Sequence, residues 1–149
     1  MTELSGLRII QPKTDEELNA YYNLRYEVLV KPWNQPPARA RDEWENNSVH
    51  FLMLNNSNEA IATGRLQLNS EVEGQIRSMA VSPAYQGNGL GRLIIKEIEK
   101  EANERKLKYI VLEARENALN FYLNCGYLAI ADSFLLFDVI KHTRMRKDL

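Results

Sequence analysis

The spacing of apolar residues predicts two long helices. In the clearer one, which starts at Leu90, apolar residues recur every three or four positions and charged residues lie opposite. Its apolar face consists of Leu90, Leu93, Ile94, Ile98 and Ala102. An earlier helix is expected to begin at Thr14, because Thr14 followed by Glu17 is a capping box. Arg25 falls within the apolar stripe of that helix, which otherwise consists of Leu18, Tyr21, Tyr22, Val28 and Leu29.

Shorter apolar runs predict the strands of a sheet. Segments 50–54 and 60–68 are expected to pair as an antiparallel hairpin, since only a short polar turn separates them. In the strand over 75–81, alternation places Ile76, Ser78 and Ala80 on one side and Arg77, Met79 and Val81 on the other. The run Tyr109–Leu112 is continuously apolar, which is typical of a strand buried on both faces.

The order of these elements predicts a mixed domain. A short strand over 7–11 and the antiparallel strands precede a strand–helix–strand unit, which should be parallel and right-handed. A short helix over 117–124, which Gly126 ends, and further strand-like runs follow. Because no linker or repeat interrupts the chain, we expect residues 1–149 to form a single α+β, or mixed α/β, domain.

Residues 31–47 show no periodic pattern and contain three prolines and two tryptophans. A loop of this length inside a compact domain is typical of a lid or a binding loop. Arg25, on the inward side of the preceding helix, must find a carboxylate or a ligand, since an unpaired buried charge is costly. Both alternatives stay open, and the candidate partners in the loop are Asp42, Glu43 and Glu45.

Three glycines at alternate positions stand between the strand at 75–81 and the helix at Leu90, in the segment Gln86–Gly91. Exposed backbone amides followed by a helix N-terminus favour a bound anion, most often phosphate. A dinucleotide fingerprint would need glycine at position 92, which is Arg92. A nucleotide P-loop would need Gly-Lys there, whereas the chain has Arg92-Leu93. The segment therefore predicts a phosphate site of another kind.

Composition narrows the function classes further. A net charge of -1 argues against a nucleic-acid-binding protein. We expect neither a membrane span nor a signal peptide, because no apolar run has the required length. A single cysteine cannot form an internal disulfide, which fits a cytoplasmic protein. Two separated histidines without clustered cysteines predict no metal site.

Two segments resemble motifs of the GNAT N-acetyltransferase superfamily. Residues 80–91 resemble its acetyl-CoA signature, Q/R-x-x-G-x-G/A, and residues 118–127 resemble its second motif, A-x-x-F-Y-x-x-x-G-F/Y. The N-terminal half is similar, more distantly, to the ElaA-like branch. The resemblance implies a central, mostly antiparallel sheet with one parallel βαβ unit, splayed central strands and flanking helices.

The same resemblance implies acetyl-CoA as the acyl donor. Backbone amides of Met79 and Val81 would hold the pantetheine arm, and one of them, that of Val81, would also polarise the thioester carbonyl. Tyr122 stands at the position of the general acid that protonates the departing thiolate. At Arg115 the chain departs from the family, because many relatives carry an asparagine there that contacts CoA. The pyrophosphate would lie on Gln86, Gly87, Asn88, Gly89, Leu90, Gly91 and Arg92.

An alkyl amine is almost fully protonated at neutral pH, so the transfer needs a proton acceptor. Glu113 is the first candidate base, and His50 and His142 follow. The expected function is transfer of acetyl to a primary amine by direct attack, with the acceptor unidentified. The alternatives are acyl-CoA-dependent acylation of an amino acid or lactone, and a non-catalytic acyl-CoA sensor. No nucleic-acid or membrane partner is expected, and a homodimer stays open. The residues expected at the acceptor are Arg25, Trp33 and Asp42.

Overall fold

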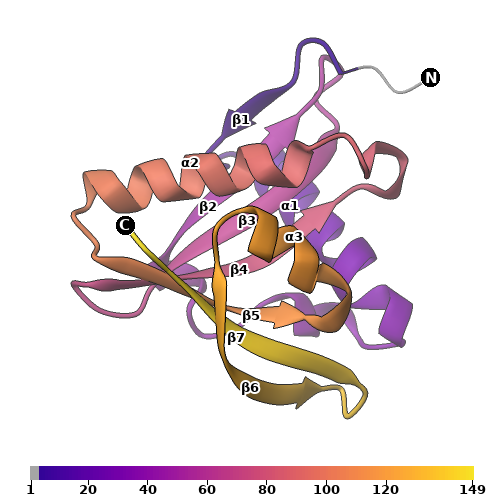
Figure 1. The fold of residues 1–149 in the computed structure, drawn as a ribbon. Helices are drawn as coiled ribbons and strands as arrows, with labels where there is room; N and C mark the ends of the chain where they lie inside the picture. The colour runs from indigo at the N-terminus through magenta and orange to yellow at the C-terminus, as the bar shows by residue number, and fades with distance from the viewer. Residues whose placement is uncertain (1–3) are drawn as a thin grey trace.

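A computed structural model describes residues 4–149 and contains one seven-stranded sheet. Figure 1 shows the sheet with helices on both of its faces. In spatial order the strands are β1 (Arg8–Ile10), β2 (Ser48–Leu54), β3 (Ala60–Leu68), β4 (Glu73–Val81), β5 (Tyr109–Arg115), β7 (Ile140–Asp148) and β6 (Leu128–Leu136). Only β4 and β5 pair in parallel, and all other neighbours are antiparallel. The predicted α+β architecture with one parallel unit is confirmed.

Within the described residues, three α-helices and five short 3-10 helices connect these strands. Helix α1 begins at the predicted capping box, where the Thr14 hydroxyl and the Glu17 carboxylate each accept a backbone N–H of the other residue, both at 3.1 Å. Among residues 4–149, no helix is long and apolar enough to cross a membrane. The helices are α1 (Asp15–Leu29), η1 (Lys31–Trp33), η2 (Pro37–Ala40), η3 (Glu45–Asn47), η4 (Pro83–Tyr85), α2 (Leu90–Glu104), η5 (Glu116–Ala118) and α3 (Leu119–Asn124).

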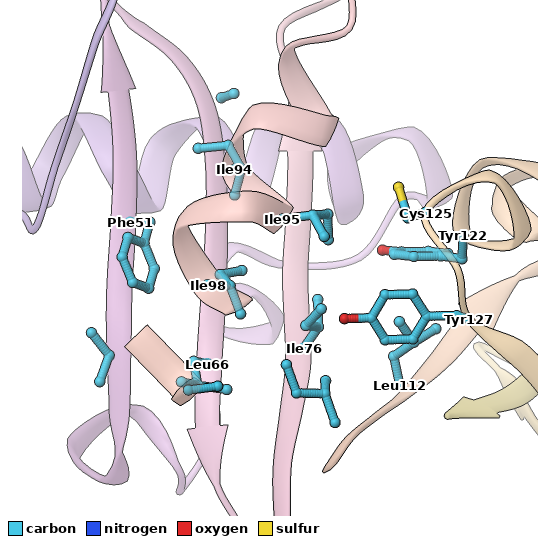
Figure 2. Packing of buried hydrophobic residues seen from close by; sticks show 14 of the residues in the cluster. Phe51, Leu66, Ile76, Ile94, Ile95, Ile98, Leu112, Tyr122, Cys125 and Tyr127 are labelled. Atoms are coloured by element: carbon cyan, nitrogen blue, oxygen red, sulfur yellow. The ribbon is translucent and has the colours of Figure 1, made fainter. Parts of the chain in front are cut away.

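Helices α1 and α2 cover opposite faces of the sheet (Figure 1). Figure 2 shows the α2 side, where isoleucines of this helix face Phe51, Leu66 and Ile76 of the strands. One prediction is wrong here, because Leu93 is 44% exposed, whereas Ile95 is buried. Gly91 packs against Phe121 of α3, so the buried side of the helix extends toward positions 91 and 95 and away from 93.

Strand β4 carries one extra residue opposite β3. Thr63 pairs with Ala80 but Arg65 pairs with Arg77, so two steps on β3 match three on β4. Ser78 has a φ of 57° at this bulge, and its carbonyl accepts the Thr63 hydroxyl at 2.8 Å. Because a bulge reverses the side-chain alternation, Met79 and Val81 pack against the same core cluster as Ile76. The expectation that they lie opposite Ile76 is therefore wrong.

The parallel pairing of β4 and β5 is short. It runs from Glu73↔Tyr109 to Ile76↔Leu112, although both strands continue beyond that point. On its other side, β5 remains paired with β7 as far as Arg115. The two central strands therefore separate at their carboxyl ends, which is the splay that the sequence resemblance implies.

Candidate active site

A cavity of about 340 Å³ lies where β4 and β5 separate. Residues from five regions line it: the end of α1, the segment over 39–42, the two splayed strands, η5 with α3, and the β6–β7 hairpin. These regions are far apart in sequence, and the sheet order brings them to one end of the split. The site is thus built around the missing pairing between two strands.

The glycine segment before α2 exposes its backbone. Gly87 and Gly89 have φ values of 82° and 76°, and a Cβ at either position would meet no atom within 4 Å. Gly89 is the N-cap of α2 and supplies no side-chain acceptor, so the first amides of the helix are available to a ligand. The Gln86 amide donates to the Val81 carbonyl at 3.0 Å, which ties the segment to β4. This geometry suits a phosphate group.

The end of β4 presents backbone groups toward the split. The Ser82 N–H donates to the Ile61 carbonyl at 2.8 Å, so Ser82 faces β3 and the peptide of Val81 faces the other way. Met79 and Val81 both lie beyond Ile76, where the pairing with β5 ends, so neither residue has a partner in that strand. Their backbone amides are therefore the candidate donors of β4 at the gap between the two strands.

Tyr122 forms part of the cavity wall and is 7% exposed. In Figure 2 its ring lies beside that of Tyr127, and both hydroxyls point away from α3. Burial raises the pKa of Tyr122, the nearby Cys125 adds to this effect, and Arg115 opposes it. The phenol therefore stays protonated at neutral pH, as a proton donor must be.

Glu113 also lines the cavity, on β5 just beyond the point where the strands separate. Its Oε1 accepts a hydrogen bond from Arg144 in an ion pair. Its Oε2 is buried and has no hydrogen-bond partner among residues 4–149. A buried carboxylate oxygen without a partner is unusual, and it offers a place for an ammonium group or a proton.

The two histidines lie in different settings. His50 is outside the cavity lining, and both its ring nitrogens are engaged, with the Tyr21 hydroxyl and the Glu45 carbonyl, each at 2.7 Å. His142 lines the cavity, with its Nδ1 at 3.0 Å from the Ile140 carbonyl and its ring stacked on Phe134. Burial lowers the pKa of His142. Of the two, only His142 faces the cavity.

Of the three residues expected at the acceptor, two line the cavity and one does not. Arg25 lines the cavity but is only 2% exposed, because its Nη1 donates to Glu45 Oε1 at 2.7 Å and its Nη2 to the Ala40 carbonyl. Asp42 lines the cavity and accepts two hydrogen bonds from Arg65, at 3.0 and 2.9 Å. Trp33 lies in η1 and is outside the cavity lining. The part of the loop that does line the cavity is the segment over 39–42.

Several cavity residues have no signal in the sequence. Phe134 and Phe137 come from the β6–β7 hairpin, and Arg39 and Arg41 come from the loop after η1. Arg77 shares its strand with the predicted Met79 and Val81, yet alternation alone does not show that it faces the cavity. Arg77 and Arg115 follow the last paired residues of β4 and β5, and only this position in the folded sheet identifies them as cavity residues.

Glu45 makes stability depend on pH. Burial opposes its ionisation, but the hydrogen bond and charge of Arg25 and the charge of Arg65 outweigh burial and lower the Glu45 pKa to about 2. A carboxylate with a lowered pKa stabilises the fold above its unfolded pKa and loses that contribution on acidification. We expect the free energy of unfolding in urea to fall between about pH 4.5 and pH 2. Glu45→Gln should flatten this dependence, and equal slopes for both proteins would contradict it.

Comparisons with known proteins agree with this geometry. Residues 18–127 match the model of the acetyltransferase (GNAT) family. The uncharacterized N-acetyltransferase YjcF of Bacillus subtilis is 28% identical over 142 residues, which cover 95% of this chain and 100% of YjcF. A crystal structure from Lactobacillus plantarum has the same fold, with a TM-score of 0.85, 23% identity, and 97% and 99% of the two chains covered.

Two further structures bear on the expected relatives. Escherichia coli ElaA aligns with a TM-score of 0.78 and 21% identity over 95% of this chain and 97% of its own, so the ElaA resemblance extends to the fold. A GNAT acetyltransferase of Elizabethkingia anophelis, solved with acetyl-CoA bound, has a TM-score of 0.78 and 16% identity, with 97% and 99% covered. Since the family model spans most of the sequence and the splayed sheet has the matching architecture, this chain belongs to the GNAT acetyltransferase family.

Proposed function

We propose that this protein transfers the acetyl group of acetyl-CoA to a primary amine by direct attack. The observation that carries the proposal is the split between β4 and β5, which lies at the cavity and at the end of the strand that leads into the glycine segment. Unpaired amides of β4 lie along this split, so an extended thioester could lie there as an additional strand would. A donor held in this way would present its carbonyl at the cavity.

The backbone amides over 86–92 are suited to the pyrophosphate of the donor. Gly87 and Gly89 leave the space above them open, and the first turn of α2 adds its partial positive charge. Leu90 and Gly91 pack against the core, so they would contribute backbone groups only. The Met79 amide is placed to hold the pantetheine arm, and the Val81 amide to donate to the thioester oxygen. Among residues 4–149, no cluster of His, Cys, Asp or Glu could hold a metal ion.

The proposed reaction has three proton transfers. The amine nitrogen attacks the thioester carbon, the carbonyl re-forms and the carbon–sulfur bond breaks, while the Tyr122 hydroxyl donates its proton to the departing CoA thiolate. The nitrogen loses a proton as the amide forms, and this proton restores the Tyr122 hydroxyl. Before the attack, the acceptor ammonium gives its first proton to Glu113 Oε2, the buried oxygen without a partner. His142 is the second candidate for this step, because it faces the same cavity.

Release of free CoA from acetyl-CoA, measured with a panel of primary amines, tests the function. Amine-dependent release with acetylated amine as the product is the expected result. Tight binding of acetyl-CoA with no turnover on any amine would replace the proposal with a non-catalytic sensor. Faster reaction with a longer acyl-CoA than with acetyl-CoA would favour acylation of an amino acid or lactone instead.

Substitution of Gly89 tests the phosphate site. Gly89→Glu is expected to weaken acetyl-CoA binding about ten- to a hundredfold in calorimetry, because it brings negative charge to the anion site and strains a residue at φ 76°. Gly89→Ala adds only the backbone strain, since its Cβ would meet no atom within 4 Å. The loss of acetyl-CoA affinity in Gly89→Ala should therefore be several-fold smaller than the loss in Gly89→Glu. Wild-type affinity in Gly89→Glu would show that the donor lies elsewhere.

A further inference from the structure

Two arginines in the cavity wall lack a close carboxylate of their own. Arg77 of β4 comes no nearer to a carboxylate than 3.9 Å, from Asp42 Oδ2, and Arg65 already holds that group at 2.9 Å. Arg115 of β5 donates to the Leu29 carbonyl at 3.0 Å, and no carboxylate of residues 4–149 lies within ion-pair distance of it. Both side chains line the cavity.

Arg25, in the same cavity wall, is an arginine whose burial is compensated by a carboxylate, that of Glu45. Burial lowers the pKa of Arg25, but the hydrogen bond that Arg25 donates to Glu45 and the electrostatic effects of Tyr21, Glu45 and Tyr22 together outweigh burial, so the net shift is upward. For Arg77 and Arg115 burial prevails and the pKa is lowered, with the positive charge of Arg65 adding to the effect on Arg77. These two guanidinium groups are therefore partly desolvated without an equivalent anion, and an anionic ligand would supply one.

The remaining charges of the wall do not supply that anion. Five arginines but only two carboxylates line the cavity, and each carboxylate is held by an arginine outside the lining. Two of the five lie on aromatic rings, Arg39 at 5.3 Å from the Phe137 ring centre and Arg41 at 3.7 Å from that of Tyr22. The cavity consequently carries a positive potential toward an approaching acceptor.

The amine site and the arginines lie a short distance apart. Glu113, with its partnerless oxygen, and Arg115 are two residues apart on β5 and face the same side, which corresponds to about 6.6 Å along a strand. Resting on the proposed function, we infer that the acceptor is a small amine carrying an anionic group, a carboxylate or a phosphate, about this distance from its nitrogen. The nitrogen lies at Glu113, and Arg77 and Arg115 bind the anion.

Matched probes test this inference by calorimetry, in the presence of saturating CoA so that the phosphate site is occupied. One pair is 5-aminopentanoate and 1-aminopentane, and the other is O-phosphoethanolamine and ethanolamine. The anionic member of at least one pair should bind about tenfold more tightly or better, and which pair shows it identifies the anion. No preference in either pair, including no binding of any probe, would overturn the inference.

Variants place the effect at these arginines. Arg77→Gln and Arg115→Gln should each weaken binding of the preferred anionic probe about tenfold and leave CoA affinity unchanged. Arg105→Gln, which removes an equal charge from an exposed pair at the far end of α2, should change neither. Equal losses for the anionic and the uncharged-tail probe would contradict the assignment. Failure of acetyl-CoA to bind or react, with the anion preference intact, would refute the proposed function and leave Arg77 and Arg115 as a binding site for anionic amines that are not acetyl acceptors.

Discussion

Replacing Tyr122 with phenylalanine is expected to lower kcat for acetyl transfer by about 10²- to 10⁴-fold, the usual contribution of a positioned general acid. The substitution removes only the hydroxyl, and the ring would still fill its place in the core beside Tyr127. Because the donor is held by backbone amides elsewhere, the affinity for acetyl-CoA should stay within about threefold. Steady-state kinetics of CoA release and calorimetry on the same preparations measure both quantities.

Tyr127→Phe is the matched control for this substitution. The Tyr127 hydroxyl donates to Glu99 Oε2 at 2.9 Å and is outside the cavity lining, while Lys147 also pairs with that carboxylate at 3.0 Å. Loss of the Tyr127 hydroxyl should therefore lower stability and leave kcat nearly unchanged. If the two variants showed equal kcat values, Tyr122 would have no role as the acid.

Replacing Glu45 with alanine is expected to lower the free energy of unfolding by about 3–5 kcal/mol, the range for breaking a buried ion pair. Glu45 binds Arg25 and Arg65 at once, and these side chains are 3% and 0% exposed. Its Oε1 also accepts the Tyr22 hydroxyl at 3.0 Å. Removing the carboxylate would leave two buried guanidinium groups short of negative charge. Urea unfolding at neutral pH, followed by circular dichroism, measures the loss.

Glu101→Ala provides the comparison for Glu45→Ala. Glu101 pairs with Arg105 at 2.8 Å on the surface of α2, in the i,i+4 arrangement, and the arginine is 44% exposed. Exposed pairs of this kind contribute less than about 1 kcal/mol. Similar losses in the two variants would mean that the Glu45 cluster is no stronger than a surface pair. A large difference would show that this cluster anchors the loop over 39–47 to the sheet.

Local signals account for the parts of the fold that the sequence predicts well. The capping box at Thr14, the helix that begins at Leu90 and the continuous apolar run in β5 depend on neighbours a few residues away, and each forms as expected. The glycine segment is likewise local, because Gly87 and Gly89 require a backbone conformation that other residues rarely adopt.

The errors share a different cause. The bulge at Ser78 arises because β4 must match β3 while leaving β5, and nothing within 75–81 marks an extra residue. Ile95 is buried in place of Leu93, because Phe121, from a helix thirty residues further along the chain, packs against α2 at Gly91 and sets which face of the helix is covered. Among the carboxylates of the loop, Glu45 becomes the partner of Arg25 only once η3 brings it beside α1.

The sequence by itself determined the family, the glycine segment and the position of Tyr122 in its motif, because these depend on contiguous residues whose backbone chemistry is local. The tertiary structure alone decided which residues line the cavity. Arg77 and Arg115 reach one cavity because two parallel strands stop pairing at Ile76 and Leu112, and the hairpin and loop close around them. Such a pocket is a product of long-range packing, in which residues distant in sequence share a surface that no local pattern encodes.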